Sequence, residues 1–297
     1  MISAVVNILK PPGMTSHDVV SYIRQRVRQK KVGHCGTLDP AAAGVLPIYL
    51  GNATRLVEYA DHFDKEYRAE LLLGVSTDTG DDTGTILRQQ RVVLPSLDIL
   101  QETVKSFQGG YDQVPPMYSA LKVAGAKLYE LARSGKEVER APRRIDISQI
   151  RLVSVQDHSL MIQVACSKGT YIRTLCEDIG AKLDLPATLS FLLRTRVGPF
   201  LIKNAVTLEE FGDEPERFLL SPEVAIAHLS AWHFDENEAG HLKHGRKVFR
   251  VPKDETESMQ DAVRLYDANN QLFGIGRYFG GSGLLQPLKI FSDGINK

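Results

Sequence analysis

The residue whose setting points most directly to chemistry is Asp39. It stands three residues after Gly36 and directly before Pro40, with His34 five residues before it and an almost wholly small or apolar run after it. Carboxylates are seldom buried without a cationic or hydrogen-bonding partner, so a charge in such a run needs an explanation. One is an Asx turn, in which Asp39 bonds a nearby backbone N–H and Pro40 fixes the turn. The other is a catalytic carboxylate.

Four other segments accompany the stretch that contains Asp39. In chain order the five segments are Lys10–Ser16, Lys30–Leu56, Lys65–Arg68, Gln113–Lys122 and Gly169–Leu175. Each resembles a motif of the TruB family of tRNA pseudouridine synthases, which modify uridine 55 in the T loop of elongator tRNAs. Five matches in the family's order cover most of residues 5 to 200, which is far more specific than one short pattern. The resemblance favours the catalytic interpretation of Asp39.

The resemblance implies three catalytic residues. Asp39 would act either as a covalent nucleophile or as the base that takes a C2′ proton. Arg173 would pair with Asp39, because an opposite charge a few ångström away keeps a carboxyl ionised at neutral pH. Tyr67 would stack on the target base, a contact of roughly 1–3 kcal/mol, and its hydroxyl is a candidate for proton transfer. The structural alternatives are a surface arginine at a helix start and a core tyrosine on a strand.

Four further residues are implied to bind the substrate. A uridine buried in a folded loop must leave its stack to react, and His34 matches the family residue that takes the vacated place. Leu192 matches an apolar pocket residue, although a core leucine would look the same. Lys10 and Tyr171 lie within the matched motifs. For Lys10, supporting the pocket and contacting phosphate both remain open.

The implied reaction sets the other requirements of the site. Converting uridine to pseudouridine breaks the N1–C1′ bond, turns the base and joins C5 to C1′. This needs a carboxylate near the sugar, a dry pocket that retains the detached uracil and a route for one proton to leave C5. No metal or other cofactor is needed, and we expect none. Cys35 is an alternative thiol nucleophile, but no basic residue is obviously placed to make it a thiolate.

Charge is unevenly distributed along the chain. Lys and Arg balance Asp and Glu at 36 each, so the formal net charge is zero. Residues 205 to 240 hold nine acids against the single base Arg217, whereas residues 21 to 34 hold no acid and five bases, Arg24, Arg26, Arg28, Lys30 and Lys31. Such segregation leaves a basic surface able to meet phosphates. A merely solvated helix face is the alternative.

The spacing of apolar residues and the positions of capping residues indicate an α/β chain of the α+β type. Capping residues and helical spacing predict an amphipathic helix over residues 16–29, and further helices begin near Ser96 and residue 172. Alternation predicts strands over residues 67–73 and 160–167. By resemblance, these elements form a pseudouridine synthase fold with a mixed, mainly antiparallel sheet.

We expect two domains. Residues 1–229 would be the catalytic domain, including a Pro- and Gly-rich insertion at about 113–145 that closes over RNA. Residues 230–297 would form a small β-rich, PUA-like RNA-binding domain, with an interdomain surface around Trp232. The chain has no apolar run approaching the ~20 residues that cross a bilayer and no basic leader, which favours the cytoplasm.

The resemblance therefore predicts a cofactor-free tRNA pseudouridine-55 synthase. Its partners would be the T arm and the acceptor arm of tRNA, with no membrane and no obligate protein partner. Two other functions compete. The fold could remodel tRNA with Asp39 in a structural role, which only an activity assay excludes. A glycosidase or nucleoside hydrolase would want a second catalytic carboxylate, and no motif nominates one.

Overall fold

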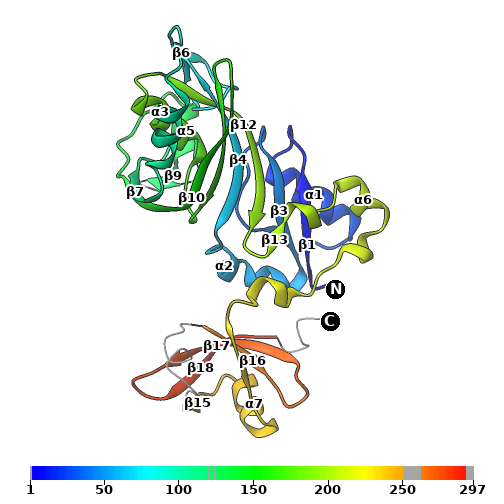
Figure 1. Cartoon of the computed structure of the whole chain (residues 1–297). Coiled ribbons are helices and arrows are strands. Elements are labelled where there is room, and N and C mark those ends of the chain that lie inside the picture. The colour runs from blue at the N-terminus through cyan, green and yellow to red at the C-terminus, as the bar shows by residue number, and fades with distance from the viewer. Residues whose placement is uncertain (1, 120, 124, 251–261, 292–297) are drawn as a thin grey trace.

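The computed structural model describes residues 2–119, 121–123, 125–250 and 262–291, and this part of the chain forms two large β-sheets (Figure 1). The first sheet has the order β1-β3-β12-β4-β11-β10-β7, with β2 beside β3 and β13 beside β12. Its neighbours pair antiparallel, except that β3 and β12 run parallel. The predicted mixed, mainly antiparallel fold is confirmed. The strands are β1 (Ala4–Lys10), β2 (Val32–His34), β3 (Ala43–Leu50), β4 (Lys65–Leu73), β7 (Gly109–Gln113), β10 (Arg143–Gln156), β11 (Ser159–Cys166), β12 (Ala187–Val197) and β13 (Phe200–Leu201).

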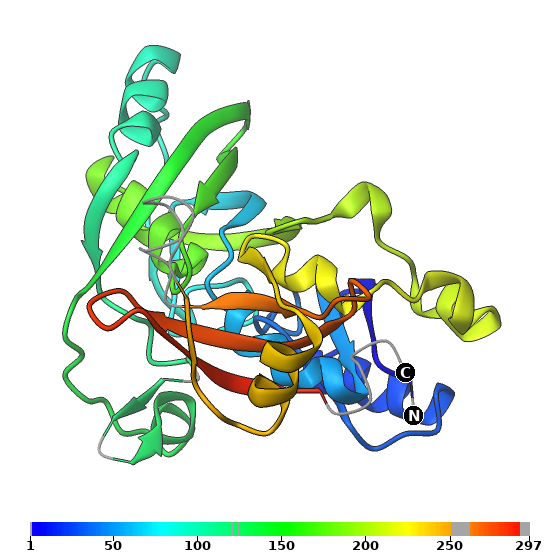
Figure 2. The same cartoon turned by 90° about the horizontal axis from the view of Figure 1, so that it is seen from below.

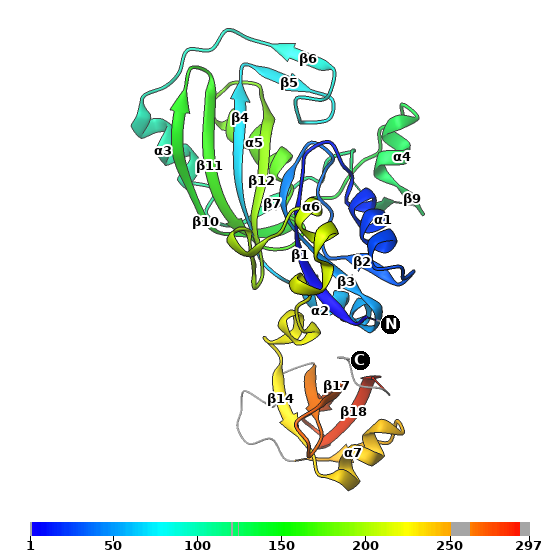
Figure 3. The ribbon, with the colours of Figure 1, turned by 90° about the vertical axis from the view of Figure 1, so that its right-hand side faces the viewer.

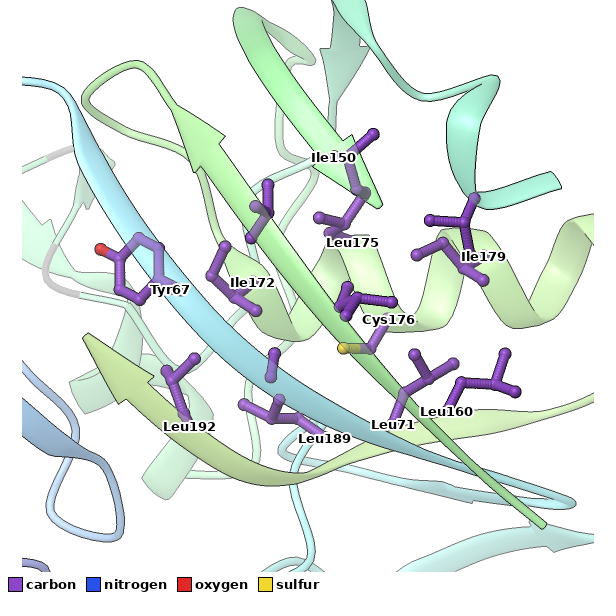
Figure 4. Packing of buried hydrophobic residues seen from close by; sticks show 14 of the residues in the cluster. Tyr67, Leu71, Ile150, Leu160, Ile172, Leu175, Cys176, Ile179, Leu189 and Leu192 are labelled. Atoms are coloured by element: carbon purple, nitrogen blue, oxygen red, sulfur yellow. The ribbon is translucent and has the colours of Figure 1, made fainter. Parts of the chain in front are cut away.

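Helices α3 (Leu97–Lys105) and α5 (Ile172–Lys182) pack against the half of the sheet that contains β12, β4, β11 and β10 (Figure 1). The predicted apolar stripe of α5 is buried there, as Leu175, Cys176 and Ile179 show in the core between helix and strands (Figure 4). Tyr67 lies at the end of this core away from Ile179 (Figure 4). The core therefore holds the start of α5 beside β4.

Helix α1 (Ser16–Arg26) begins at a complete capping box. The Thr15 hydroxyl accepts from the Asp18 backbone N–H, and the Asp18 carboxylate accepts from the Thr15 backbone N–H. The helix ends three residues before the predicted end, because Arg28 has φ +51° and a left-handed residue cannot continue a right-handed helix. With α6 (Leu208–Asp213), α1 covers β1 and β3 through a core that includes Val19, Val20, Ile23 and Phe211.

The parallel contact between β3 and β12 joins the two halves of the sheet. Gly44 lies opposite Arg194 there, with φ +120°. A Cβ on Gly44 would lie 2.2 Å from the Arg194 carbonyl oxygen, so only glycine permits the strands to approach this closely. The Asp39 segment leads directly into this junction.

The insertion begins and ends at one place in the sheet. Gln113 at the end of β7 pairs with Arg143 at the start of β10. Between them lie β8 (Lys122–Val123), β9 (Ala126–Lys127) and α4 (Leu128–Arg133). Residues 120 and 124 and the side chain of Lys122 lie outside the described part. A separate hairpin of β5 (Val75–Thr77) and β6 (Ile86–Gln89) lies at the end of the molecule away from the second sheet (Figure 3).

The second sheet has the order β14-β16-β17-β18-β15 and lies beneath the α2 end of the first part (Figure 1), so it is in front when the molecule is seen from below (Figure 2). It consists of β14 (Ser230–His233), β15 (Val248–Phe249), β16 (Val263–Tyr266), β17 (Leu272–Phe279) and β18 (Leu284–Ile290), with helix α7 (Glu236–Lys243). Strands β16 and β17 contain the short, mainly apolar runs at residues 263–266 and 272–276. Residues 251–261 and 292–297 lie outside the described part.

The contact between the two sheets has an apolar cluster and polar contacts beside it, such as Arg55 Nη1 to the Ile290 carbonyl at 2.7 Å and the Tyr266 hydroxyl to Glu223 Oε2 at 2.6 Å, and Trp232 does not form it. Tyr266, Leu272 and Ile275 of the second sheet share a buried cluster with Ala225 and Ile226. The first part contributes η1 (Gly51–Leu56), α2 (Val57–Ala60) and η4 (Pro222–Ile226) to this side. The short 3-10 helices η2 (Ile202–Asn204) and η3 (Pro215–Phe218) precede η4 in the chain.

The expectation that Trp232 lies at the interdomain surface was wrong. Its indole is 1% exposed within the second sheet's own core, against Phe234, Leu265 and Phe273. Trp232 is the largest apolar side chain of the second sheet, so its burial in the core of that sheet removes the most apolar surface from water. Among the described residues, no helix is long and apolar enough to cross a membrane.

Candidate active site

The predicted pair of Asp39 and Arg173 is present. Arg173 Nε lies 3.2 Å from Asp39 Oδ2, and the arginine side chain is 7% exposed against 42% for the aspartate. A buried guanidinium that contacts a half-open carboxylate holds it from one side and leaves the other side accessible. This geometry suits a carboxylate that must meet a substrate. It also excludes the surface-arginine alternative for Arg173.

The two terminal nitrogens of Arg173 bind backbone carbonyls of two further loops. Nη1 donates to the Thr79 carbonyl at 2.9 Å, and Nη2 donates to the Tyr118 carbonyl at 2.8 Å. Asp81 Oδ2 lies 4.0 Å from Nη1. One side chain thus connects the Asp39 segment, the β5–β6 hairpin and the start of the insertion. Asp81 and these carbonyls gave no sequence signal, because they come together only through the fold.

The Asp39 segment is fastened at several backbone points. Ser16 Oγ donates to the Leu38 carbonyl at 3.1 Å and accepts from the Leu38 N–H at 2.9 Å. Gly13 N–H donates to the Pro40 carbonyl at 2.9 Å. The start of α1 and the turn before it therefore hold the backbone on both sides of Asp39.

Lys10 adds a cation to this support. Its side chain is fully buried, and Nζ donates to the carbonyls of Pro11 at 2.9 Å, Met14 at 2.5 Å and Pro40 at 3.1 Å. Burial lowers the pKa of Lys10 to about 8, and the charge of Asp39 opposes that shift. All three ammonium hydrogens are used, so Lys10 in this structure supports the pocket. It does not face solvent to meet a phosphate.

Tyr67 and Leu192 lie together in the wall beside the Asp39 segment (Figure 4). They belong to one buried cluster with Leu38, Ala42 and Ile172. Leu192 is 9% and Tyr67 7% exposed, so Tyr67 is neither a free surface ring nor fully sealed. Burial raises the pKa of Tyr67 to about 12, which keeps its hydroxyl protonated near neutral pH. The wall is apolar, as a pocket that retains uracil requires.

His34 and Tyr171 lie at the edges of the same region. His34 ends β2, and burial together with the charge of Arg194 lowers its pKa below the usual range, so the ring is neutral at pH 7. Tyr171 precedes α5, where its N–H donates to Gln113 Oε1 at 2.8 Å and its carbonyl accepts from Gln113 Nε2 at 3.1 Å. These contacts assign no role to either residue, so the substrate-binding roles of His34 and Tyr171 stay predictions.

Three family models match consecutive parts of the chain. The TruB family pseudouridylate synthase N-terminal domain matches residues 24–172, the tRNA pseudouridylate synthase B C-terminal domain matches residues 173–220, and the C-terminal model of pseudouridine synthase II TruB matches residues 231–290. A curated tRNA pseudouridine synthase B of Heliobacterium mobile is 45% identical over 292 residues, 96% of this chain and 94% of the relative. The chain belongs to the TruB family. It is therefore a pseudouridylate synthase.

Other comparisons agree with membership of the TruB family. A tRNA pseudouridine synthase B of Alkaliphilus oremlandii is 51% identical over 231 residues, 77% of each chain. Among solved structures, a chain of a Cbf5-Nop10-Gar1 complex covers 99% of this chain and 87% of its own length, with a TM-score of 0.75 at 27% identity. A chain of an H/ACA RNP bound to substrate RNA, at 24% identity and a TM-score of 0.73, shares the fold.

In this TruB-family chain the thiol alternative finds no support. Cys35 is 1% exposed, and burial raises the pKa of its thiol to about 11. A nucleophilic cysteine needs a lowered pKa and access to the substrate. Within the described residues, no group of three or more His, Cys, Asp or Glu side chains is arranged to hold a metal ion.

One residue at this TruB-family site escaped the sequence analysis as a functional candidate. Arg194 on β12 is 1% exposed and lies directly opposite Tyr67 on β4. The signal was present, because a charge two residues after Leu192 falls on the buried side of an alternating strand. Its hydrogen bonds go to backbone carbonyls that only the tertiary structure brings to it.

Proposed function

We propose that this chain isomerises uridine 55 in the T loop of tRNA to pseudouridine, with Asp39 as the reacting carboxylate. The pair of Asp39 and Arg173 at 3.2 Å carries the proposal, because it presents an oriented carboxylate beside an apolar wall. The relatives named tRNA pseudouridine synthase B support tRNA as the substrate.

The chemistry assigned to these residues begins at the sugar. Asp39 either attacks C1′ and expels uracil as an anion, or takes the C2′ proton while the N1–C1′ bond breaks and leaves a glycal. The detached uracil turns within the wall formed by Tyr67 and Leu192, and C5 then bonds to C1′. In the covalent route this step breaks the bond between Asp39 and C1′ and releases the carboxylate, and in the glycal route Asp39 returns the proton to C2′. The C5 proton leaves to solvent or a nearby base, and N1 gains one, so the product is an isomer of the substrate.

We assign roles to the other site residues by their match to the family's motifs. Tyr67 stacks on the flipped base, and its protonated hydroxyl is available as a donor. His34, neutral at the end of β2, fills the place that the base leaves. Tyr171 lines the same site at the start of α5. Arg173 pairs with Asp39 and holds the carboxylate in its orientation.

We also assign the parts of the chain. Residues 1–229 form the catalytic domain, and residues 230–297 form a PUA-like domain that binds the acceptor arm. The insertion at about 113–145 closes over the T arm. Its support is the contact of the Tyr118 carbonyl with Arg173, which links the insertion to the reacting carboxylate. We also assign the enzyme to the cytoplasm, where a tRNA substrate would be met, and assign it no obligate protein partner.

The test is to incubate the protein with an unmodified tRNA transcript, without added metal or cofactor, and to map pseudouridine. We expect one product site at position 55. Asp39→Asn keeps the shape of the side chain and removes its charge, so we expect a loss of turnover of at least about 10⁴-fold with unchanged tRNA affinity. Asp157→Asn is the matched control, because Asp157 is exposed in the turn between β10 and β11 at φ +43°, which Asn tolerates.

The outcomes separate the competing functions. A protein that binds tRNA tightly without forming pseudouridine would be a tRNA-remodelling protein. Free uracil and an abasic site would indicate a hydrolase. Substantial turnover by Asp39→Asn would leave the isomerase standing and remove Asp39 as its reacting group.

A further inference from the structure

Arg194 has the environment of a group that holds other groups in place. All three of its nitrogens donate to backbone carbonyls: Nε to Val45 at 2.8 Å, Nη2 to Gly36 at 3.0 Å and Nη1 to Thr37 at 3.3 Å. Gly36 and Thr37 lie just before Asp39, and Val45 lies in β3 after it. The guanidinium therefore spans the loop that carries the reacting carboxylate.

The charge of Arg194 is not neutralised by a direct ion pair. Among the described residues, no carboxylate lies within 4.0 Å of its guanidinium. Burial lowers the pKa of Arg194, and its neighbour Tyr67, followed by Cys35 and Asp39, acts in the opposite direction. Burying an unpaired cation is strongly unfavourable, so a core leucine at this position would be expected if stability were the only demand.

The space around the guanidinium is fully packed. Gly36 adopts φ +75°, and a Cβ there would lie 3.3 Å from Lys65 Cε and 3.4 Å from Arg194 Nη1. Arg194 also lies directly opposite Tyr67 across the β12–β4 pair, where side chains share one face of the sheet. A shift of the guanidinium would move the Asp39 loop relative to the ring of Tyr67.

We propose that Arg194 is a positioning residue for the isomerase: its guanidinium fixes the Asp39 loop at the distance from Tyr67 that the reaction requires. The inference rests on the proposed function. It concerns a residue that contacts neither Asp39 nor substrate directly, and it differs from the role of Arg173, which pairs with the carboxylate itself.

The fork of the arginine is essential to this role. A guanidinium presents five donors in a rigid plane, whereas a lysine ammonium is a point charge on a flexible stem. Arg194→Lys keeps the charge but cannot reach the carbonyls of residues 36, 37 and 45 at once. Because a misplacement of about 1 Å in a reacting group costs about 10²-fold in rate, we expect kcat to fall by about that factor.

The experiment compares wild type, Arg194→Lys and Arg196→Lys on a T-arm stem-loop, well below each protein's melting temperature. Arg196 is the matched control, two residues along β12, where it pairs at the surface with Glu66 at 3.3 Å. We expect Arg194→Lys to lose about 10²-fold in kcat with RNA affinity and KM close to wild type. Arg196→Lys should retain wild-type kcat. Partial loss of folded protein would also lower the apparent kcat and leave the KM unchanged. The concentration of folded enzyme is therefore measured by titration with RNA, and kcat is calculated from that concentration.

Wild-type kcat in Arg194→Lys, or an equal loss in Arg196→Lys, would overturn the inference while leaving the isomerase intact. A wild-type protein without activity would instead remove the proposed function and this inference with it. If Arg194→Lys shows no cooperative melt, Gly36→Ala perturbs the same contact from the other side. Its matched control is Gly33→Ala, whose methyl would meet Thr54 Cγ2 at an ordinary 3.9 Å. Unchanged kcat in Gly36→Ala would then refute the inference.

Discussion

Because of Glu177, the free energy of unfolding of this protein should fall as the pH rises from 4.5 to about 7. It lies one helical turn after Arg173 on α5, beneath the β5–β6 hairpin, where a Cβ on Gly80 would lie 2.9 Å from Glu177 Oε1. Burial first, and then the charge of Asp178, raise the pKa of Glu177 to about 7, although Arg173 and Arg140 oppose the shift. The carboxyl is therefore largely protonated in the folded protein at slightly acid pH.

The sign follows from the protons bound by each state. Below pH 4.5 both the folded and the unfolded protein hold the Glu177 proton. Between pH 4.5 and about 7 the unfolded chain releases it and the folded chain keeps it, so rising pH favours unfolding. Above about pH 7 both states are ionised and the full penalty is present. The difference between the two pKa values corresponds to at most about 3 kcal/mol, less whatever the partial exposure of the side chain removes.

Glu177→Gln is the variant that tests this effect, because glutamine has the same shape and no charge. We expect it to be more stable than wild type by about 2–3 kcal/mol at pH 8.5 and by much less at pH 5.0. Urea denaturation at both pH values measures the two differences. Glu102→Gln, on the exposed side of α3, is the control and should change little at either pH. An equal difference for Glu177→Gln at the two pH values would refute the reasoning, since it would show that no proton is linked to unfolding.

Two further predictions concern the RNA surfaces. Arg24 is half-buried and donates to the Val32 carbonyl at 3.0 Å, so the exposed residues Arg28, Lys30 and Lys31 are the better set to neutralise. Their replacement by glutamine should reduce the slope of log K against log salt by about 2, and an unchanged slope would mean that this surface is only solvated. Deletion of residues 230–297 should raise the KM for whole tRNA by about tenfold and leave kcat on a T-arm stem-loop intact. The truncated protein should also melt at a lower temperature, because Ala225 and Ile226 lose their apolar partners, and a well-folded truncation that loses kcat on the stem-loop would contradict the domain assignment.

The sequence by itself determined most of the elements and the family. Helix α1 could be predicted because its capping box and apolar spacing are local features that lie within a few residues of each other. The same holds for the stripe of α5 and the alternation of β4 and β11. Asp39 and Arg173 were found through motifs, since each motif is a short continuous segment.

The tertiary structure decided what these residues do to one another. Arg173 lies off the apolar stripe of α5, and its burial depends on the Thr79 and Tyr118 carbonyls that distant loops bring to it. The end of α1 was misplaced because Arg28 adopts a left-handed conformation that helix propensity does not reveal. Trp232 was placed at the wrong surface, since sequence shows that a large ring will be buried but not against which sheet.

Arg194 illustrates the physical reason most clearly. A charge on the inner side of a strand can be read from the sequence, but its acceptors are carbonyl oxygens, and every residue carries one. Which carbonyls a buried guanidinium meets depends on the close approach of β3 and β12 at Gly44. Motifs therefore identified the groups that react, whereas long-range backbone contacts, which leave no residue-specific signature, determined how those groups are held.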